Sequence, residues 1–347
     1  PTILSGDFNN NDVVTLSESG RLNFSNNNEN AYHVLVAGGI SDISLNGFII
    51  IGGNANGSGD IKVGGVEIYR NSGGLFAGKN LNRTTITNCV FKHGSAIHMG
   101  GGIDIQSSNK TIIKQCDVKL NNANHGGGLS FRNYLLSNVY QIDKCSIISN
   151  NANKDGGGVI GRGGNTQITN SIISGNTAID NHGGGVYVYR EKNNSKAYLA
   201  MSGCIVSGNK AAAEGGGLRV ATYLNGNESN EGDSKRVELF ASIYNCTFSG
   251  NKAGNGGGIY RHEARSQLDV VNSIIWGNSS SIKGGEVVRM NVSYSVVEGG
   301  FNGNNITFDP LFVDQPSYLL APFTGGDFQL QSCSEARNSG TSNDIKV

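Results

Sequence analysis

The 347-residue sequence is poor in charge, in aromatic residues and in proline. Charged residues make up 16% and aromatic residues 7%, and there are only 4 prolines. The 27 basic residues balance the 27 acidic ones, so nothing in the composition favours a nucleic acid or an anionic membrane as a partner. Disordered chains combine low hydrophobicity with high net charge, whereas this chain is neutral and has regularly spaced Val, Ile and Leu.

Long apolar runs are also missing. The longest, GFIII at 47–51, falls far short of the roughly 20 residues that a membrane-spanning helix needs, so we expect no membrane insertion. Glycine, by contrast, is abundant, with 52 residues, and so is asparagine. The stretch NCTFSGNKAGNGGGIYR at 245–261 shows their arrangement: Asn-Cys, then Ser-Gly-Asn, then Gly-Gly-Gly.

This arrangement recurs along the chain with fixed internal spacing. A column of small residues comprises Cys89, Cys116, Cys145, Ser171, Cys204, Cys246 and Ser273. Five residues later in each unit stand Gly94, Asn121, Asn150, Asn176, Asn209, Asn251 and Asn278, and a glycine run follows. The units are 26 to 42 residues long, and such a period with constant offsets indicates a repeat architecture.

Each unit holds short β-branched runs between Gly and Asn, such as TIIKQCDV and LDVVNSII, which leave no room for helices. Parallel strands normally need long crossovers. A coil of about 25 residues supplies them by stacking each strand about 4.8 Å from its own copy. We therefore predict an all-β fold: a single right-handed parallel β-helix of roughly ten coils over residues 1–300, closed by a segment at 301–347.

The columns have structural interpretations within this fold. The asparagines should sit at a tight turn, where Asn tolerates left-handed backbone angles and its amide can bond the coils on either side. The glycines should supply positive φ or allow close approach to a neighbouring coil. In-register cysteine side chains point the same way, which opposes the torsion of a disulfide. We predict buried free thiols rather than disulfides or metal ligands.

Parts of the sequence resemble known families. FSGN at 248–251 followed by GGGI at 256–259 resembles the repeats of the polymorphic outer-membrane protein family. The opening TILSGDFNNND and the closing FDPLFVD with GDFQLQ are similar to secreted bacterial right-handed β-helix proteins. The resemblance implies a bacterial protein that is secreted or on the outer cell surface, with adhesins, autotransporter passengers and polysaccharide-acting enzymes as relatives. A shared fold does not choose among these activities.

One outward row of side chains follows the glycine runs. In this register it contains Arg132, Arg162, Tyr187, Tyr189, Arg219, Tyr260 and His262. Tyrosine faces stack on sugar rings, and guanidinium groups bind carboxylate or sulfate. We predict a non-catalytic module of adhesin or passenger type that binds a polysaccharide or a host or cell-surface glycan along this row. The alternative is an ordinary exposed sheet face. Since the row points outward, Tyr187→Ala and Arg219→Ala should leave folding intact.

A second polar column lies just before the glycines: His125, Asp155, His182, Glu214, Asn255 and Lys283. Such residues could ligate a metal or act as acid and base, or they could be solvated turn residues. A polysaccharide lyase would need a base such as Arg162 or Lys154 beside a dense acidic cluster, which is missing. We therefore lean against an enzyme and assign no catalytic residue. A lyase or glycoside hydrolase on the same face, or a structural spacer, remain alternatives.

Two further expectations concern the ends and insertions of the chain. Asp7, Asn9, Asn11 and Glu18 match positions 1, 3, 5 and 12 of the calcium-loop template, although position 6, normally Gly, is Asp12. Calcium is thus a candidate cofactor, and a polar turn is the alternative. Insertions at 190–197 and 222–238 should project beside the outward row. No anchor or sorting signal is recognisable, so we expect further domains in a longer chain.

Overall fold

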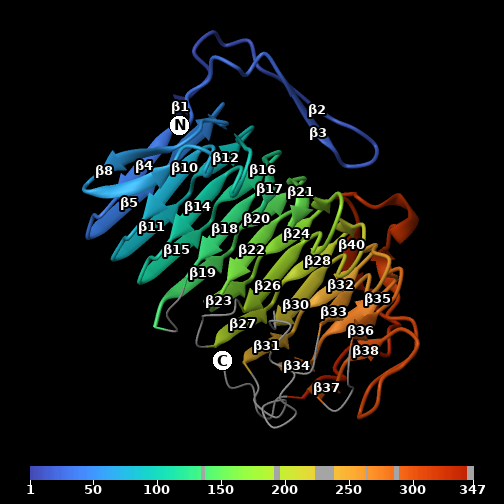
Figure 1. Cartoon of the computed structure of the whole chain (residues 1–347). Helices are drawn as coiled ribbons and strands as arrows, with labels where there is room; N and C mark the ends of the chain where they lie inside the picture. Colours follow the sequence, from blue (N-terminus) through green and yellow to red (C-terminus); the bar gives the residue numbers. More distant parts are fainter. Residues whose placement is uncertain (134–136, 191–195, 223–237, 263–264, 285–288, 342–347) are drawn as a thin grey trace.

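The computed structural model describes residues 1–133, 137–190, 196–222, 238–262, 265–284 and 289–341 (Figure 1). The chain winds into a parallel β-helix with 52% strand and 1% helix, which confirms the predicted all-β parallel solenoid. Each complete coil passes through four sheets, which are named I to IV below and follow one another along the chain in the order I, IV, II, III. Most of the two expected insertions, 190–197 and 222–238, lies outside the described residues.

Among the described residues, sheet I has ten parallel strands and sheets II and III have nine each. Sheet I consists of β1 (Thr2–Ser5), β6 (Phe48–Ile51), β12 (Val90–Lys92), β16 (Asp117–Lys119), β20 (Ser146–Ile148), β24 (Ile172–Ser174), β28 (Ile205–Ser207), β32 (Thr247–Ser249), β35 (Ile274–Trp276) and β38 (Val296–Val297). Sheet II consists of β4 (Leu35–Gly38), β10 (Phe76–Lys79), β14 (Ile103–Gln106), β18 (Leu129–Arg132), β22 (Val159–Arg162), β26 (Val186–Arg190), β30 (Leu218–Thr222), β33 (Ile259–Arg261) and β36 (Ile282–Gly284).

Sheets III and IV complete each coil. Sheet III consists of β5 (Asp42–Asn46), β11 (Arg83–Thr87), β15 (Lys110–Lys114), β19 (Val139–Asp143), β23 (Gly164–Thr169), β27 (Ala197–Ser202), β31 (Leu239–Tyr244), β34 (Ser266–Val271) and β37 (Met290–Ser293). The short sheet IV consists of β7 (Asn54–Ala55), β13 (Ser95–Ala96), β17 (Asn122–His125), β21 (Asn151–Asp155), β25 (Thr177–Ala178) and β29 (Lys210–Ala211).

In-register stacking of aliphatic residues forms the core of the solenoid. On sheet III one such stack is Ile86, Ile113, Ile142, Ile168, Met201, Ile243, Val270 and Val292, each at most 2% exposed. Burying a side chain of this size stabilises the fold by about 1.5–3 kcal/mol. The inward positions are thus occupied by the core, and functional side chains are left to the outer faces and the corners.

The cysteine column lies inside the corner between sheets III and I. The six cysteines, all within the described residues, are free thiols, and only Cys333 is exposed, as predicted. Cys116 Sγ donates to Lys114 O (3.2 Å), and Ser171 Oγ donates to Thr169 O (2.7 Å). The site therefore takes a small side chain that can donate a hydrogen bond. The hydrogen bond with Cys145 raises the pKa of Cys116 to about 12.

The asparagine column forms a buried amide ladder. Asn150 Nδ2 donates to Asn176 Oδ1 (3.0 Å) on the next coil and to Val118 O (2.8 Å) on the previous one, which confirms the predicted bonding between coils. The prediction of left-handed asparagines is wrong. The left-handed residue is the one before each asparagine, such as Ser149 (φ 53°) or Gly175 (φ 63°), because the chain turns there and the amide must then point inward.

The glycine runs meet both expectations placed on them. The first glycine has positive φ, as at Gly126 (φ 63°). The second allows the coils to approach, since a Cβ on Gly127 would lie 2.3 Å from Asn151 O of the next coil. Most other side chains would collide there, because real Cβ atoms are not found so close to a backbone oxygen.

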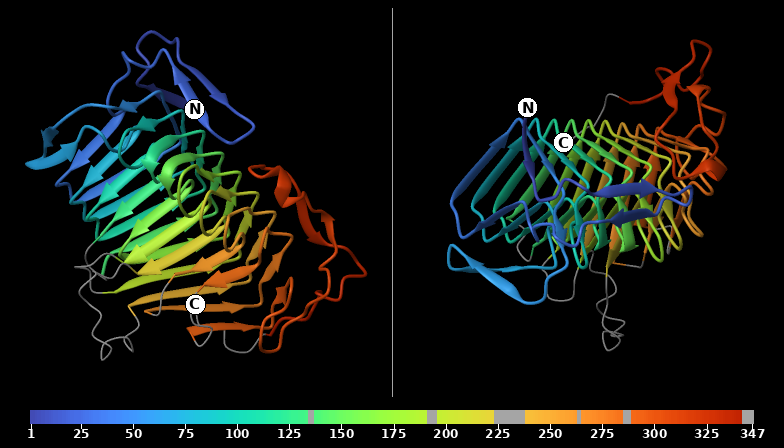
Figure 2. Two further views of the ribbon diagram at one scale, coloured as in Figure 1. Left: turned by 45° about the vertical axis from the view of Figure 1, so that its right-hand side comes forward. Right: turned by 90° about the horizontal axis from the view of Figure 1, so that it is seen from above.

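The C-terminal segment folds back along the outside of sheet I (Figure 2). It contains η2 (Tyr318–Leu320) and an antiparallel pair, β39 (Phe312–Asp314) with β40 (Asp327–Leu330). Phe323 N donates to Gly208 O (3.1 Å), and a Cβ on Gly250 would lie 2.3 Å from Phe323 Cζ. The positive φ alone does not require glycine in the Ser-Gly-Asn motif, because Ser149 adopts a similar φ of 53°. Glycine at 208 and 250 is required by the docked segment, which a Cβ would meet.

In the part of the chain that the structure describes, two antiparallel hairpins leave the solenoid. The first, β2 (Val13–Leu16) with β3 (Leu22–Ser25), runs over sheet IV, where Leu22 N donates to Asn151 Oδ1 (3.4 Å). A Cβ at the hairpin tip, on Gly20, would lie 2.5 Å from Pro322 Cγ, so the tip meets the C-terminal segment (Figure 2). The second, β8 (Asp60–Val63) with β9 (Val66–Tyr69), lies beside the first strands of sheet II.

Candidate functional site

The predicted outward row lies on the outer face of sheet II. Arg132 is aligned with Arg162, and Arg162 with Tyr189, in the register of successive strands. A neighbouring row contains Tyr187, Arg219 and Tyr260 in register, and His262 follows directly after β33. The strand register thus places six of the seven residues in two neighbouring rows of sheet II rather than in one.

Their expected exposure is wrong for three of the seven. Tyr187 is fully buried, Tyr189 is 6% exposed and Arg219 is 3% exposed. A small apolar cluster on the outside of the sheet explains this burial: Tyr187 packs with Tyr189, Ile160 and Ala221, and the two tyrosine rings lie 5.0 Å apart. These three side chains are structural supports, and Tyr187→Ala would not leave folding intact.

Arg219 connects this cluster to the polar corner between sheets IV and II. Its Nε donates to Glu214 Oε2 (2.9 Å), and its Nη1 donates to the Tyr187 hydroxyl. The guanidinium carbon lies 4.8 Å from the centre of the Tyr187 ring. Burial of an arginine is tolerated here because its charge is paired and its hydrogen bonds are made.

Arg132 is held in a similar way at the other end of the row. Its Nη2 donates to Asp104 Oδ2 (2.7 Å), which also accepts a hydrogen bond from Gln106 Nε2 (2.8 Å). The guanidinium lies 5.6 Å from the ring of Tyr69, which belongs to the hairpin β8–β9. Tyr69 was missed as a site residue, because a hairpin that departs from the repeat cannot be placed over the face from sequence.

The second polar column lies along the corner where sheet IV gives way to sheet II. Bridges join His125 to Asp155 and His182 to Glu214 on adjacent coils. His125 Nδ1 lies 3.1 Å from Asp155 Oδ2, and His182 Nδ1 lies 3.5 Å from Glu214 Oε2. The corner therefore holds two histidine–carboxylate pairs.

The two remaining predicted members of that column lie at its end. Asn255 continues the column, because it is bridged to Glu214, and it is exposed. The prediction is wrong for Lys283, which is also exposed but pairs with Tyr260 on sheet II, because β36 begins fewer residues after the preceding turn than the glycine alignment assumes. His98 joins the column at the other end, with its ring centre 6.2 Å from that of His125. The glycine alignment did not reveal His98, because Met99 occupies the position directly before the glycine.

Desolvation dominates the electrostatics of this corner. Burial lowers the pKa of His98, and the charges of Arg132 and Arg162 lower it further. Burial also lowers the pKa of His182, with Arg219 acting in the same direction. Burial raises the pKa of the Tyr260 hydroxyl, as does the charge of Glu214. Neutral imidazoles are thus favoured until an anion approaches them.

The cations generally lie further out than the carboxylates that hold them. The side-chain exposure is 12% for Arg132 against 1% for Asp104, and 18% for His125 against 12% for Asp155. Among the ion pairs described along this face, the buried Arg219 differs, with 3% exposure against 18% for Glu214. The band that solvent meets along this face contains partly exposed imidazole and guanidinium groups, namely His98, His125, His182, His262, Arg132 and Arg162.

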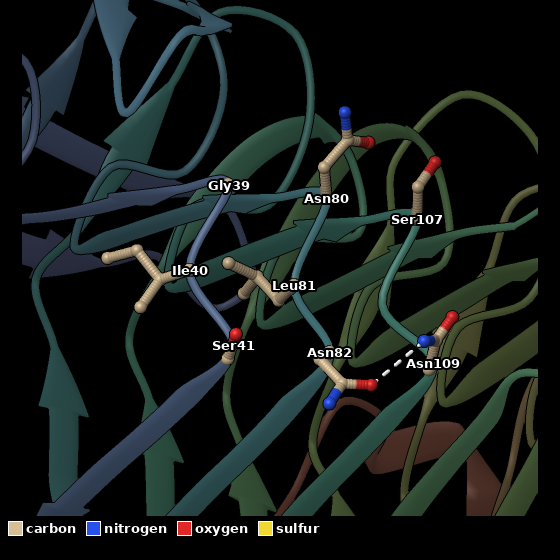
Figure 3. Close-up of a pocket in the computed structure, with 8 residues that line it drawn as sticks. All are labelled: Gly39, Ile40, Ser41, Asn80, Leu81, Asn82, Ser107 and Asn109. Carbon is tan, nitrogen blue, oxygen red and sulfur yellow. Dashed lines mark hydrogen bonds between the residues drawn. The ribbon is translucent and has the colours of Figure 1, made fainter.

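A cavity of about 410 Å³ lies at a different corner, between sheets II and III (Figure 3). Asn80, Asn82 and Asn109 line it together with serines, and Asn109 Nδ2 donates to Asn82 Oδ1 (2.9 Å). Its lining has no titratable side chain, so it offers no acid, base or charge for catalysis.

The N-terminal residues selected by the calcium template are only partly brought together. The carboxylate of Asp7 lies with those of Asp12 and Glu29. The backbone N of Asn11 donates a hydrogen bond to Asp7 Oδ1 (3.2 Å). Asn9 and Glu18 are exposed, and Glu18 lies in the turn of the hairpin β2–β3, outside this carboxylate cluster.

Comparisons of the chain with protein-family models, with curated proteins and with solved structures give no match. In the part of the chain that the structure describes, no helix is both long and apolar enough to cross a membrane.

Proposed function

We propose that this β-helix is a secreted or surface-exposed bacterial protein that binds an acidic polysaccharide along the outer face of sheet II. The observation that carries the proposal is the band of partly exposed imidazole and guanidinium groups, which runs over the consecutive coils of β14, β18, β22 and β26 and includes His262 beyond β33. The resemblance of FSGN and GGGI to polymorphic outer-membrane protein repeats supports the surface location. Further domains of a longer chain would present this face.

The roles within the row differ from those first expected. Arg162, Tyr260 and His262 are partly exposed and can contact a ligand, whereas Tyr187 and Arg219 hold the face in shape. Coils repeat at about 4.8 Å, close to the length of one sugar residue, so an extended chain along the solenoid axis would meet one coil per sugar. Affinity should therefore grow with ligand length and weaken with salt.

The proposal has a defined pH dependence. The pKa values of His98 and His182 are lowered from the usual 6.5, so in the absence of ligand these rings are neutral at pH 7. An anionic ligand favours the protonated form and raises those pKa values by linkage. Affinity for an acidic glycan should therefore rise as the pH falls through and below 6.5, while affinity for a neutral glycan should not.

Calorimetry with polygalacturonate oligomers of increasing length tests the proposal. Arg162→Gln removes one partly exposed cation of the band, and we expect it to weaken binding by about tenfold. Arg83→Gln removes a cation that is 62% exposed on sheet III and serves as the matched control, with unchanged affinity expected. Equal affinities of the wild-type protein and Arg162→Gln, or binding without dependence on pH, would overturn the assignment to this face.

A second candidate is a polysaccharide lyase or hydrolase on the same face. The histidine–carboxylate pairs at 3.1 and 3.5 Å favour it, because an imidazole close to a carboxylate is a usual arrangement for a general base, although hydrogen-bond geometry between them is not formed here. Ultraviolet absorbance of unsaturated products, followed with the same oligomers, separates lyase activity from binding. Turnover that is lost in His125→Gln or His182→Gln would replace the binding proposal, and binding without turnover would exclude the lyase.

A further inference from the structure

Three carboxylates converge at the base of the hairpin β2–β3. Asp7 and Asp12 lie in the loop that leads into β2, and Glu29 follows β3. One oxygen from each of the three lies within 4.8 Å of the others. The fold thus brings groups of like charge together from the two sides of the hairpin, and these groups repel one another unless a cation lies between them.

Several oxygens at this place lack a hydrogen-bond donor among the described residues. They are Asp12 Oδ1, Glu29 Oε1 and Asn30 Oδ1, and each of these atoms is buried. The Asn30 side chain is 7% exposed and reaches the cluster, where its Nδ2 donates to Asp12 Oδ2 (2.7 Å). A buried acceptor without a donor costs about 1–3 kcal/mol, so three of them together favour the binding of a cation at this place.

The existing donors do not balance the charge. Asn11 N and Asp12 N donate to the two oxygens of Asp7 at 3.2 and 3.1 Å, and Asn30 donates to Asp12. These are neutral donors facing three carboxylates.

We propose that Asp7, Asp12 and Glu29 bind a calcium ion at the base of the hairpin β2–β3. Calcium binds oxygen ligands at about 2.3–2.6 Å, so two oxygens that share one ion lie at most about 5 Å apart, and the three carboxylates meet this condition because their oxygens lie within 4.8 Å of one another. An all-oxygen set without His or Cys suits calcium rather than zinc. Magnesium is disfavoured because it demands near-ideal octahedral geometry and keeps its waters.

Asn30 can supply a fourth oxygen. The nitrogen and oxygen of an amide are assigned from the surrounding hydrogen bonds, and a cation replaces the need for a donor toward Asp12. A half-turn of the amide then places Oδ1 where Nδ2 now lies, 2.7 Å from Asp12 Oδ2. That separation is close to the distance between adjacent oxygens around one calcium ion.

The ion would act on the hairpin as a whole. Asn26 Nδ2 donates to Asn11 O (3.2 Å) across the base of the hairpin, and Asn54 Nδ2 of β7 donates to Asn27 O (2.8 Å). A cation at this point fixes both sides of the hairpin to the first coil. It thereby limits the movement of the tip, which meets the C-terminal segment.

Calorimetric titration of the full chain with calcium chloride tests the site. We expect one ion per chain with a dissociation constant between about 10⁻⁵ and 10⁻³ M. Glu29→Gln and Asp12→Asn should each weaken binding by at least about tenfold. Glu18→Gln is the matched control: it removes one exposed carboxylate of the same hairpin, outside the cluster, and should leave the affinity unchanged.

Hydrogen exchange of the wild-type protein gives an answer that does not depend on any variant. Calcium should slow exchange in residues 13–25, which form the hairpin, and magnesium at the same concentration should have little effect. The proposal would be overturned if no binding were detected at about 10⁻² M calcium. It would also be overturned if Glu18→Gln and Glu29→Gln lost calcium affinity equally, or if magnesium slowed hydrogen exchange of the hairpin as much as calcium.

Discussion

The buried asparagine ladder gives the sharpest test of what holds the coils together. Asn209 is fully buried, and its side chain makes four hydrogen bonds. Its Nδ2 donates to Ile173 O (2.8 Å) and Asn251 Oδ1 (3.0 Å). Its Oδ1 accepts from the backbone N and the Nδ2 of Asn176, both at 3.0 Å. Asn209→Ala removes all four and leaves the buried backbone N–H of Asn176 without its acceptor, so we expect a loss of about 3–5 kcal/mol.

An exposed amide pair between coils provides the control for this variant. Asn109 donates to Asn82 at 2.9 Å on the surface, and Asn109→Ala should cost less than about 0.5 kcal/mol. Equilibrium unfolding in urea measures both variants, and hydrogen exchange locates the loss, because solenoids can open locally. If Asn209→Ala and Asn109→Ala differed by less than about 1 kcal/mol, the ladder would not be a major source of stability.

The isosteric variant Asn209→Asp adds a pH signature. It places an oxygen where Nδ2 faces the acceptors of Ile173 and Asn251, and burial together with these acceptors should raise the pKa of the new carboxyl above its usual value near 3.9. A raised folded-state pKa means that stability is lost as the pH rises through it. The defect of Asn209→Asp should therefore be largest at neutral pH and should shrink on acidification, which the same urea titrations at two pH values would show.

Three further predictions concern other parts of the structure. Gly208→Ala should release the C-terminal segment, because its Cβ would lie 2.3 Å from Phe323 O; proteolysis at 316–341 should accelerate while the solenoid stays intact, and unchanged cleavage would contradict the docking argument. Tyr187→Ala should cost about 3–5 kcal/mol in thermal or urea unfolding, since the ring is fully buried, and a neutral effect would restore the view of an exposed platform. Iodoacetamide should modify Cys333 in the native protein and leave the five buried thiols intact, as mass spectrometry would show; rapid modification of a second thiol would contradict the packed corner.

The sequence reveals the coil register because each coil repeats the same constraints at the same offsets. Aligning the glycine runs correctly placed Arg132 beside Arg162 and Arg219 beside Tyr260. The small column and the amide ladder were recognisable for the same reason, since one position in every coil faces the same neighbours. A repeat thus encodes which residues are adjacent.

Exposure could not be read in the same way, because it depends on partners outside the repeat. Tyr187 is buried by an apolar cluster on the outer face and by an arginine that bends back toward Glu214. Tyr69 reaches Arg132 from a hairpin that interrupts the periodic pattern. Likewise, a linear calcium template could select Asp7 but not Glu29, which approaches it only after the chain has formed the hairpin β2–β3.

The contact between the tip of the first hairpin and Pro322 can form only with one number of coils between the two ends of the solenoid. A solenoid bound only by nearest neighbours would accept an inserted or deleted coil with little penalty elsewhere. Here the hairpin and the C-terminal segment start from opposite ends of the stack and must reach the same place. Adding or removing one coil would move the two apart or together by about 4.8 Å, enough to separate Gly20 from Pro322 or to make them collide. The hairpin β2–β3 and the C-terminal segment together therefore fix the length of the solenoid. A change in coil number should occur only together with a change in the length of the hairpin or of the C-terminal segment.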